Sequence, residues 1–122
     1  MPKSVLIVED EPFIMEALSF LLKREGLNVS TYADGNGCVE RIQSLKPDLV
    51  ILDMMLPNKS GMQILEDLRT MNSFLNLPVL MLTAKGQKKD RAAAEQAGVS
   101  LFMTKPFANK EIIQNVHRLL GA

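Results

Sequence analysis

Two short apolar runs in this chain each end in acidic side chains. Asp53 follows the run at residues 49–52, and Glu9 and Asp10 follow the run at residues 5–8. Short runs rich in branched side chains are typical of strands buried on both faces. A carboxylate at the end of such a strand is costly to bury unless a cation or hydrogen bonds compensate its charge. The pattern therefore indicates a site for a cation.

Apolar, strand-like runs alternate along the chain with segments that have the hydrophobic period of an α-helix. Strands are predicted at residues 4–8, 28–32, 48–52, 79–82 and 100–103, and helices at about 12–26, 38–45, 60–71, 88–97 and 109–120. The short, polar second strand suits a sheet edge, and Asn109 is expected to cap the last helix. Strands and helices in this order predict an α/β fold, a parallel sheet covered on both faces. We find no repeat or interior linker, so residues 1–122 are expected to form one domain.

Polar residues follow the other strands of the predicted sheet as well. Thr83 comes directly after residues 79–82, and Lys105 comes shortly after residues 101–103. Each has an ordinary explanation alone, because strand-end lysines are usually solvated and threonines often cap turns. In a parallel sheet, however, the carboxyl ends share one rim, where ligands bind beside the point at which strand order reverses. Their coincidence with the acids indicates a functional site.

Composition excludes several other classes. The chain has 14 basic and 14 acidic residues, so charge does not favour binding to nucleic acid or to an anionic membrane. The apolar runs are too short to span a bilayer, and no signal-peptide pattern is present. Cys38 is the one cysteine, which favours a reducing, cytoplasmic setting and a role as a small buried hydrophobe.

The chain resembles the receiver domains of two-component response regulators over essentially all of its length. The resemblance rests on VEDEP at residues 8–12, LDMMLP at 52–57, Gly61, LTA at 82–84 and KPF at 105–107. It implies a flavodoxin-like, doubly wound (βα)5 fold with strand order 2-1-3-4-5. An acidic pair alone would be weak evidence for this family, but the whole set of motifs, in this order and at these spacings, is strong evidence.

The resemblance implies that Asp53 accepts a phosphoryl group from a histidine kinase or a histidine phosphotransfer protein. A carboxylate that attacks phosphorus approaches a group that is itself negative, and Mg²⁺ reduces this repulsion. Asp10, Asp53 and the backbone carbonyl of Met55 would be direct metal ligands, and Glu9 would act through water. The domain would assist its own phosphorylation and dephosphorylation without being an enzyme.

The same resemblance implies roles for the other polar residues at this rim of the sheet. Lys105 would supply positive charge to the phosphoryl oxygens, and the Thr83 hydroxyl would donate to another. Thr83 and Phe102 resemble the switch pair of the family, in which the aromatic ring fills space that the hydroxyl leaves. The Lys105–Pro106 bond is expected to be cis, as in the family.

The first helix indicates a partner surface. Phe13, Ala17 and Phe20 form an apolar stripe on a different side from the one expected to face the sheet. In receivers this helix docks the phosphotransfer helices of the kinase. We expect contacts through this stripe, through Ile14, and through the loop at Pro106 and Phe107.

Three other functions are disfavoured. A Mg²⁺-dependent aspartyl phosphatase of the haloacid dehalogenase type needs a second aspartate two positions after the nucleophile, where this chain has Met55. A nucleotide-binding site would need a glycine-rich loop after the first strand, and none is there. A degenerate receiver conflicts with the complete set of acids, threonine and lysine.

Some properties stay open at this stage. The domain could be a stand-alone regulator or part of a chain with an output domain. The segment at residues 97–102 lacks the paired acids that many transcriptional receivers carry before the switch aromatic. Their salt-bridged dimer through the fourth and fifth helices is therefore in doubt for this chain. Met55 and Lys85 are expected to flank the phosphoryl group and to slow its hydrolysis, because neither side chain activates water.

Overall fold

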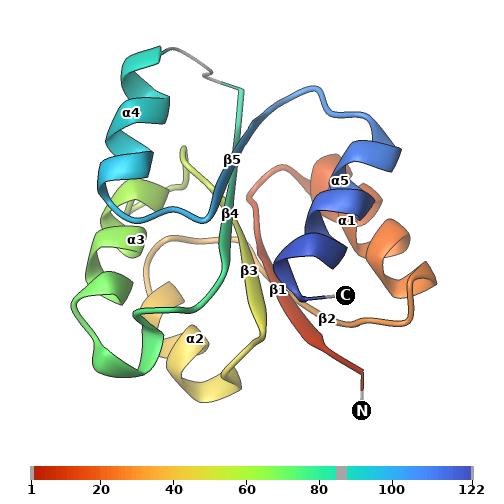
Figure 1. Ribbon diagram of the computed structural model, residues 1–122, viewed down its shortest axis with the longest axis horizontal. Helices are drawn as coiled ribbons and strands as arrows, with labels where there is room; N and C mark the ends of the chain where they lie inside the picture. The colour runs from red at the N-terminus through yellow and green to blue at the C-terminus, as the bar shows by residue number, and fades with distance from the viewer. Residues whose placement is uncertain (1, 85–87, 122) are drawn as a thin grey trace.

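Five strands and five α-helices alternate along the chain in the computed structural model, which describes residues 2–84 and 88–121 (Figure 1). The strands are β1 Ser4–Val8, β2 Asn28–Tyr32, β3 Leu49–Asp53, β4 Val79–Thr83 and β5 Leu101–Thr104. The helices are α1 Pro12–Arg24, α2 Cys38–Leu45, α3 Gly61–Arg69, α4 Lys88–Gln96 and α5 Asn109–Leu119, with a short 3₁₀ helix η1 at Asn72–Phe74. The predicted alternation is confirmed.

The strands form one parallel sheet in the order β2-β1-β3-β4-β5, which is the predicted topology. The polar strand β2 lies at one edge, as its composition predicts. Strand order reverses between β1 and β3, where Val8 is paired with Leu52. The carboxyl ends of the central strands therefore share one rim, and Asp53 stands on that rim.

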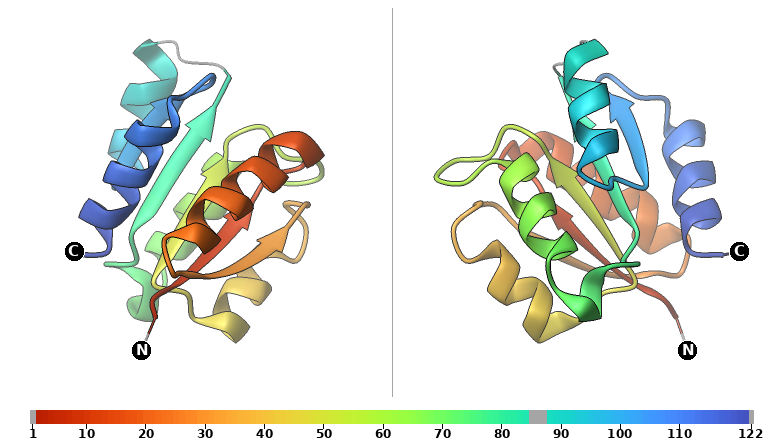
Figure 2. Two further views of the ribbon diagram at one scale, coloured as in Figure 1. Left: turned by 90° about the vertical axis from the view of Figure 1, so that its right-hand side faces the viewer. Right: turned by 60° about the vertical axis from the view of Figure 1, so that its left-hand side comes forward.

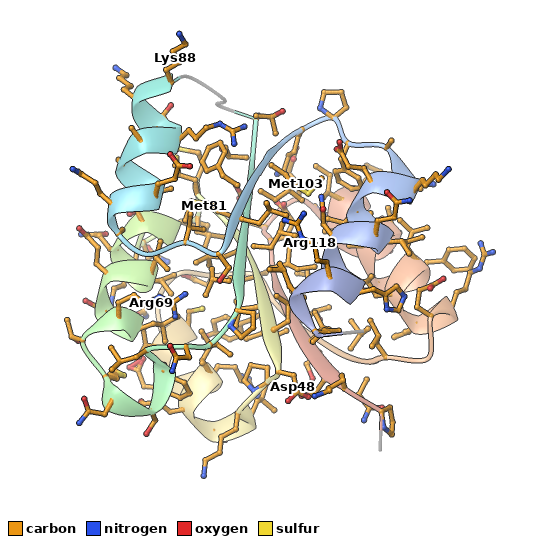
Figure 3. The ribbon with its side chains drawn as sticks, in the orientation of Figure 1. Asp48, Arg69, Met81, Lys88, Met103 and Arg118 are labelled. Carbon is orange, nitrogen blue, oxygen red and sulfur yellow. The ribbon has the colours of Figure 1, made fainter. Side chains whose placement is uncertain are left out.

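Helices cover both faces of the sheet (Figure 2). Helices α1 and α5 pack on one face, and α2, α3 and α4 pack on the other. Figure 3 labels one core residue from each face: Met81 belongs to the cluster under α2, α3 and α4, and Met103 to the cluster under α1 and α5. Every residue of β3 and β4 is buried, because helices cover both of their faces.

Local sequence signals set several helix ends. Helix α1 begins with Pro12, whose missing N–H is not needed in the first turn, and Gly26 follows its end with a φ of 81°. Helix α3 begins with a capping box, in which the Ser60 hydroxyl accepts from the Gln63 N–H and the Gln63 side chain accepts from the Ser60 N–H. No helix in the described part of the chain is long and apolar enough to cross a membrane.

The structure corrects several details of the sequence prediction. Asn109 is not the cap of α5, because Ala108 holds that position with extended backbone and no side-chain cap. Strands β3 and β5 each begin one residue later than predicted, and β3, β4 and β5 each end one residue later. Helix α3 ends at Arg69, before the 3₁₀ helix η1, which was not predicted.

Cys38 is fully buried at the start of α2, as predicted. Burial raises the pKa of its thiol to about 12, with a smaller contribution from the charge of Glu40. The side chain therefore packs as a small hydrophobe rather than as a reactive thiol.

Candidate functional site

Three carboxylates meet at the carboxyl ends of β1 and β3. Asp53 is the last residue of β3, and Glu9 and Asp10 directly follow β1. One carboxylate oxygen from each lies within 4.8 Å of the others. Glu9 and Asp53 are buried, whereas Asp10 is exposed. The predicted acidic cluster is therefore assembled, and Asp10 forms its solvent side.

Lys105 reaches this cluster from the loop after β5. Its ammonium nitrogen lies 2.7 Å from a Glu9 carboxylate oxygen, 3.4 Å from Asp53 and 3.6 Å from Glu11. The Lys105 N–H donates to the backbone carbonyl of Thr83 at 2.8 Å, which ties this loop to the end of β4. The Lys105–Pro106 peptide bond is cis, as predicted. Sequence reasoning missed the Glu11 contact, although Glu11 stands in the same acidic run.

Burial and the ion pairs shift the pKa values of Glu9 and Lys105 in opposite directions. Burial raises the pKa of Glu9, although its contacts with Lys105 and the Glu11 N–H oppose this effect. Burial alone would lower the pKa of Lys105, but hydrogen bonding to Glu9 and the charge of Asp53 outweigh it, so the net shift is upward. Lys105 therefore stays positively charged near neutral pH and partly neutralises the acids.

The chain turns sharply after Asp53. One Asp53 carboxylate oxygen accepts from the Met55 N–H at 3.2 Å, while the Met55 side chain is 53% exposed. The Gly61 N–H donates to the Met54 carbonyl at 2.9 Å. A Cβ atom at Gly61 would lie 2.2 Å from the Asp53 carbonyl oxygen, so only glycine fits there. This close approach explains why Gly61 accompanies the motif around Asp53.

A second loop supports the segment after Asp53. The Asn58 side-chain amide donates to the Asp34 carboxylate at 2.9 Å, and the Gly35 N–H donates to the Pro57 carbonyl at 3.0 Å. The bond to Asn58 is the main reason that the pKa of Asp34 is lowered. Sequence reasoning missed this pair, because the two residues are 24 positions apart and neither belongs to a known spacing.

Thr83 and Phe102 lie on neighbouring strands. Phe102 is paired with Met81 in the register of β4 and β5, so Thr83, two residues after Met81, is its diagonal neighbour on the same face. Thr83 is buried, and the Phe102 ring is only 5% exposed. The guanidinium carbon of Arg91, in α4, lies 4.9 Å from the centre of the Phe102 ring. Arg91 was not singled out in the sequence, because a lone cation in a polar helix carries no signal.

The apolar stripe predicted on α1 is exposed. Phe13 and Phe20 are 87% and 62% exposed, and Ala17 is exposed between them. Ile14 is half-buried against the core between α1 and α5, so it offers only part of its surface. In the loop after β5, Pro106 is exposed and Phe107 is half-buried. Lys85 lies outside the described residues.

Comparison with known proteins decides the family. The sequence model of the response regulator receiver domain matches residues 5–117. The chain belongs to this family. Its receiver fold, with parallel strands in the order β2-β1-β3-β4-β5, agrees with that membership. No observation favours the haloacid dehalogenase alternative.

Two curated relatives of this receiver domain are transcriptional regulators by name. The chain is 42% identical over 119 residues to a protein of Mycobacterium tuberculosis assigned as the transcriptional regulatory protein TcrX. It is 38% identical over 120 residues to the alkaline phosphatase synthesis transcriptional regulatory protein PhoP of Bacillus subtilis. The alignments cover 98% of this chain but only 50% and 49% of these relatives, so the chain spans about half their length.

Solved structures share the fold of the receiver domain. A crystal structure assigned as a response regulator of Chloroflexus aurantiacus superposes with a TM-score of 0.94 at 31% identity, covering all of both chains. The chemotaxis protein CheY4 of Vibrio cholerae has a TM-score of 0.90 at 25% identity, covering 98% of this chain and 99% of that chain.

Proposed function

We propose that this receiver domain accepts a phosphoryl group from a phosphohistidine donor onto Asp53. The observation that carries the proposal is the buried Asp53 carboxylate at the end of β3, with two further acids and the Lys105 ammonium group around it. An Asp53 oxygen would form a bond to phosphorus, the phosphorus–nitrogen bond of the donor would break, and the imidazole would leave with the electron pair. Such a transfer depends mainly on positioning and on charge stabilisation, which this cluster offers.

The three carboxylates suit Mg²⁺. This ion prefers hard oxygen ligands and is usually held by one or two carboxylates, phosphate oxygens and retained waters. Asp10, Asp53 and the Met55 carbonyl would hold it directly, and Glu9 would act through water. When bound, the ion would offset the negative charge that accumulates around the phosphoryl group. The close approach of the three acids, with a single ammonium group between them, supports this assignment.

Lys105 and Thr83 would stabilise the phosphorylated state. The Lys105 ammonium group already lies 3.4 Å from Asp53, so a small movement would bring it to a phosphoryl oxygen. Thr83 ends the neighbouring strand β4, and its hydroxyl would donate to another oxygen. When this hydroxyl moves, the ring of Phe102, the diagonal neighbour of Thr83 on β5, would fill the space that it leaves.

The product of the reaction would be a phosphorylated signalling domain rather than a released metabolite. Met55 stands where a phosphatase of the haloacid dehalogenase type carries an aspartate that acts as acid and base. A thioether cannot transfer that proton, so turnover of external phosphate esters is not expected. We take residues 1–122 as one such domain, acting in the cytoplasm, where the buried thiol of Cys38 would stay reduced.

A histidine kinase or a histidine phosphotransfer protein would dock on α1. The exposed stripe of Phe13, Ala17 and Phe20 supports this, because neighbouring exposed aromatic residues are unusual on a surface without a partner. The Pro106–Phe107 segment extends the surface on the side of Lys105, and half-buried Ile14 contributes its edge. The docked histidine would then lie near the acidic cluster.

Chemical phosphorylation tests the proposal without a partner protein. Purified protein incubated with acetyl phosphate and Mg²⁺ should gain one phosphoryl group by intact mass. Addition of EDTA should prevent the gain, and so should the Asp53→Asn substitution. Full phosphorylation of the Asp53→Asn variant would show that Asp53 is not the acceptor.

A further inference from the structure

Helix α4 has an unusually small apolar contact with the sheet. Ala94 is its only buried residue, whereas α3 buries Ile64, Leu65 and Leu68. Figure 3 shows Lys88, the first residue of α4, extending away from the rest of the molecule. Burial of one alanine removes little apolar surface from water. Contacts other than hydrophobic packing must therefore contribute to the position of α4.

Arg91 makes two such contacts, both with Phe102. Its guanidinium group lies over the Phe102 ring at 4.9 Å, which is a favourable distance for a cation–π interaction. The same group donates a long hydrogen bond, 3.4 Å, to the backbone carbonyl of Phe102. Arg91 stands three residues before Ala94, so both residues face β5.

The charge of Arg91 has no carboxylate partner among the residues that the structure describes. The ion pairs of this part of the chain involve Lys59, Lys105 and His117 instead. The guanidinium group therefore forms no ion pair with these residues and can interact with the Phe102 ring. It lies over the ring of a residue that is only 5% exposed with Arg91 in place and that belongs to the same core cluster as Ala94.

We propose that Arg91 is a positioning residue that holds the Phe102 ring in its buried position before Asp53 is phosphorylated. The inference rests on the proposed function, because it concerns how phosphorylation at Asp53 is read by Thr83 and Phe102. An aromatic switch without a hydroxyl group has no polar atom to anchor it in water. The contact with Arg91 favours the buried position of the ring, so the unphosphorylated domain already populates the ring position that phosphorylation would favour.

The consequence is a linkage between α4 and the phosphorylation site. A contact that stabilises the buried ring also raises the affinity of the domain for a phosphoryl analogue, provided that the analogue favours the same ring position. A cation–π contact at an exposed site corresponds to about a two- to fivefold change in the equilibrium. Loss of Arg91 should therefore weaken the coupling between the position of the Phe102 ring and binding of the analogue, while the binding site at Asp53 stays intact.

Fluorine NMR of protein labelled with 4-fluorophenylalanine tests the proposal. The chain has five phenylalanines, and a Phe102→Leu variant identifies the Phe102 resonance by its loss. The measurement is the shift of each resonance between H₂O and D₂O, which reports exposure to solvent. The buried Phe74 is the internal reference for general loosening of the fold.

Three variants of α4, two at Arg91 and one at Lys89, should separate the role of Arg91 from a general effect of removing positive charge from the helix. Arg91→Gln should raise the exposed population of Phe102 about two- to fivefold while Phe74 stays unchanged, and Arg91→Lys should have a smaller effect. Lys89→Gln, at an exposed position of the same helix, should match the wild type. Addition of beryllofluoride with Mg²⁺, as a phosphoryl analogue, should restore burial of Phe102 in Arg91→Gln.

The outcomes distinguish this inference from the proposed function. If Arg91→Gln leaves Phe102 as buried as in the wild type, or if Lys89→Gln exposes it equally, Arg91 does not position the ring. Failure of beryllofluoride to bind at Asp53 would instead count against the proposed function, and the measurement without analogue would still decide the role of Arg91.

Discussion

The Lys105 ammonium group lies closer to Glu9, at 2.7 Å, than to Asp53, at 3.4 Å. Before phosphorylation the lysine thus mainly neutralises Glu9, the most deeply placed acid of the cluster. A phosphoryl group on Asp53 would present new oxygens to the same ammonium group. Lys105 would then exchange part of its contact with Glu9 for the phosphoryl group, while Mg²⁺ compensates the acids.

Replacement of Lys105 by methionine should have opposite effects on folding and on metal binding. Without metal, the unpaired acids should lower the free energy of unfolding by roughly 1.5–3 kcal/mol, the range for hydrogen bonds to charged groups. Mg²⁺ affinity should rise, because a positive charge no longer repels the ion. Denaturant unfolding and calorimetric Mg²⁺ titration measure both. Lys110→Met, at an exposed position of α5, is the matched control, and lower Mg²⁺ affinity in Lys105→Met would contradict this account.

Replacement of Asp10 by asparagine should weaken Mg²⁺ binding without harming the metal-free fold. Asp10 is exposed, and it makes no hydrogen bond or ion pair within the described part of the chain. Its removal should lower repulsion among the acids, so the melting temperature without metal should stay equal or rise. Mg²⁺ affinity should fall about tenfold or more. A large loss of metal-free stability would mean that Asp10 has a structural role instead.

Replacement of Met55 by asparagine should shorten the lifetime of the phosphorylated state. The Met55 side chain is 53% exposed beside Asp53 and offers no hydrogen bond to orient an attacking water, whereas an amide does. Loss of label from purified phosphoprotein measures the lifetime. Lys85→Glu tests the same idea at the second position. If neither variant loses its label faster than the wild type, the two side chains do not shield the phosphoryl group.

Replacement of Phe20 by alanine should slow phosphotransfer from a cognate kinase by roughly tenfold or more, which is typical of an aromatic residue central to an interface. Phosphorylation by acetyl phosphate should not change, because Phe20 lies outside the acidic cluster. Leu75→Ala, at another exposed apolar residue, is the control. Equal transfer rates in wild type and Phe20→Ala would place the kinase contact elsewhere.

The sequence predicted the parts of this structure that depend on local pattern. Strands β1 and β3 are buried apolar runs, and their terminal acids must meet because parallel strands end on one rim. The cap of α5 was predicted wrongly, because asparagine is a good cap but the extended backbone falls at Ala108. That geometry depends on how the chain leaves β5, which no local preference at Asn109 reveals.

Contacts between distant segments were not predictable from this sequence. The bond between Asn58 and Asp34 joins two loops, and the contact of Arg91 with Phe102 joins α4 to β5. Each involves residues that are common on surfaces, so their types alone favour no contact. Their positions follow only from how loops and helices pack on the sheet.

The most direct test of the central claim is to locate the phosphoryl group on the chain. Protein phosphorylated by acetyl phosphate with Mg²⁺ is reduced with borohydride, which converts an aspartyl phosphate to homoserine, and its peptides are analysed by mass spectrometry. This account predicts homoserine at position 53 alone, with none in samples containing EDTA. Homoserine at position 10, or a phosphorylated protein with an unmodified Asp53, would contradict it.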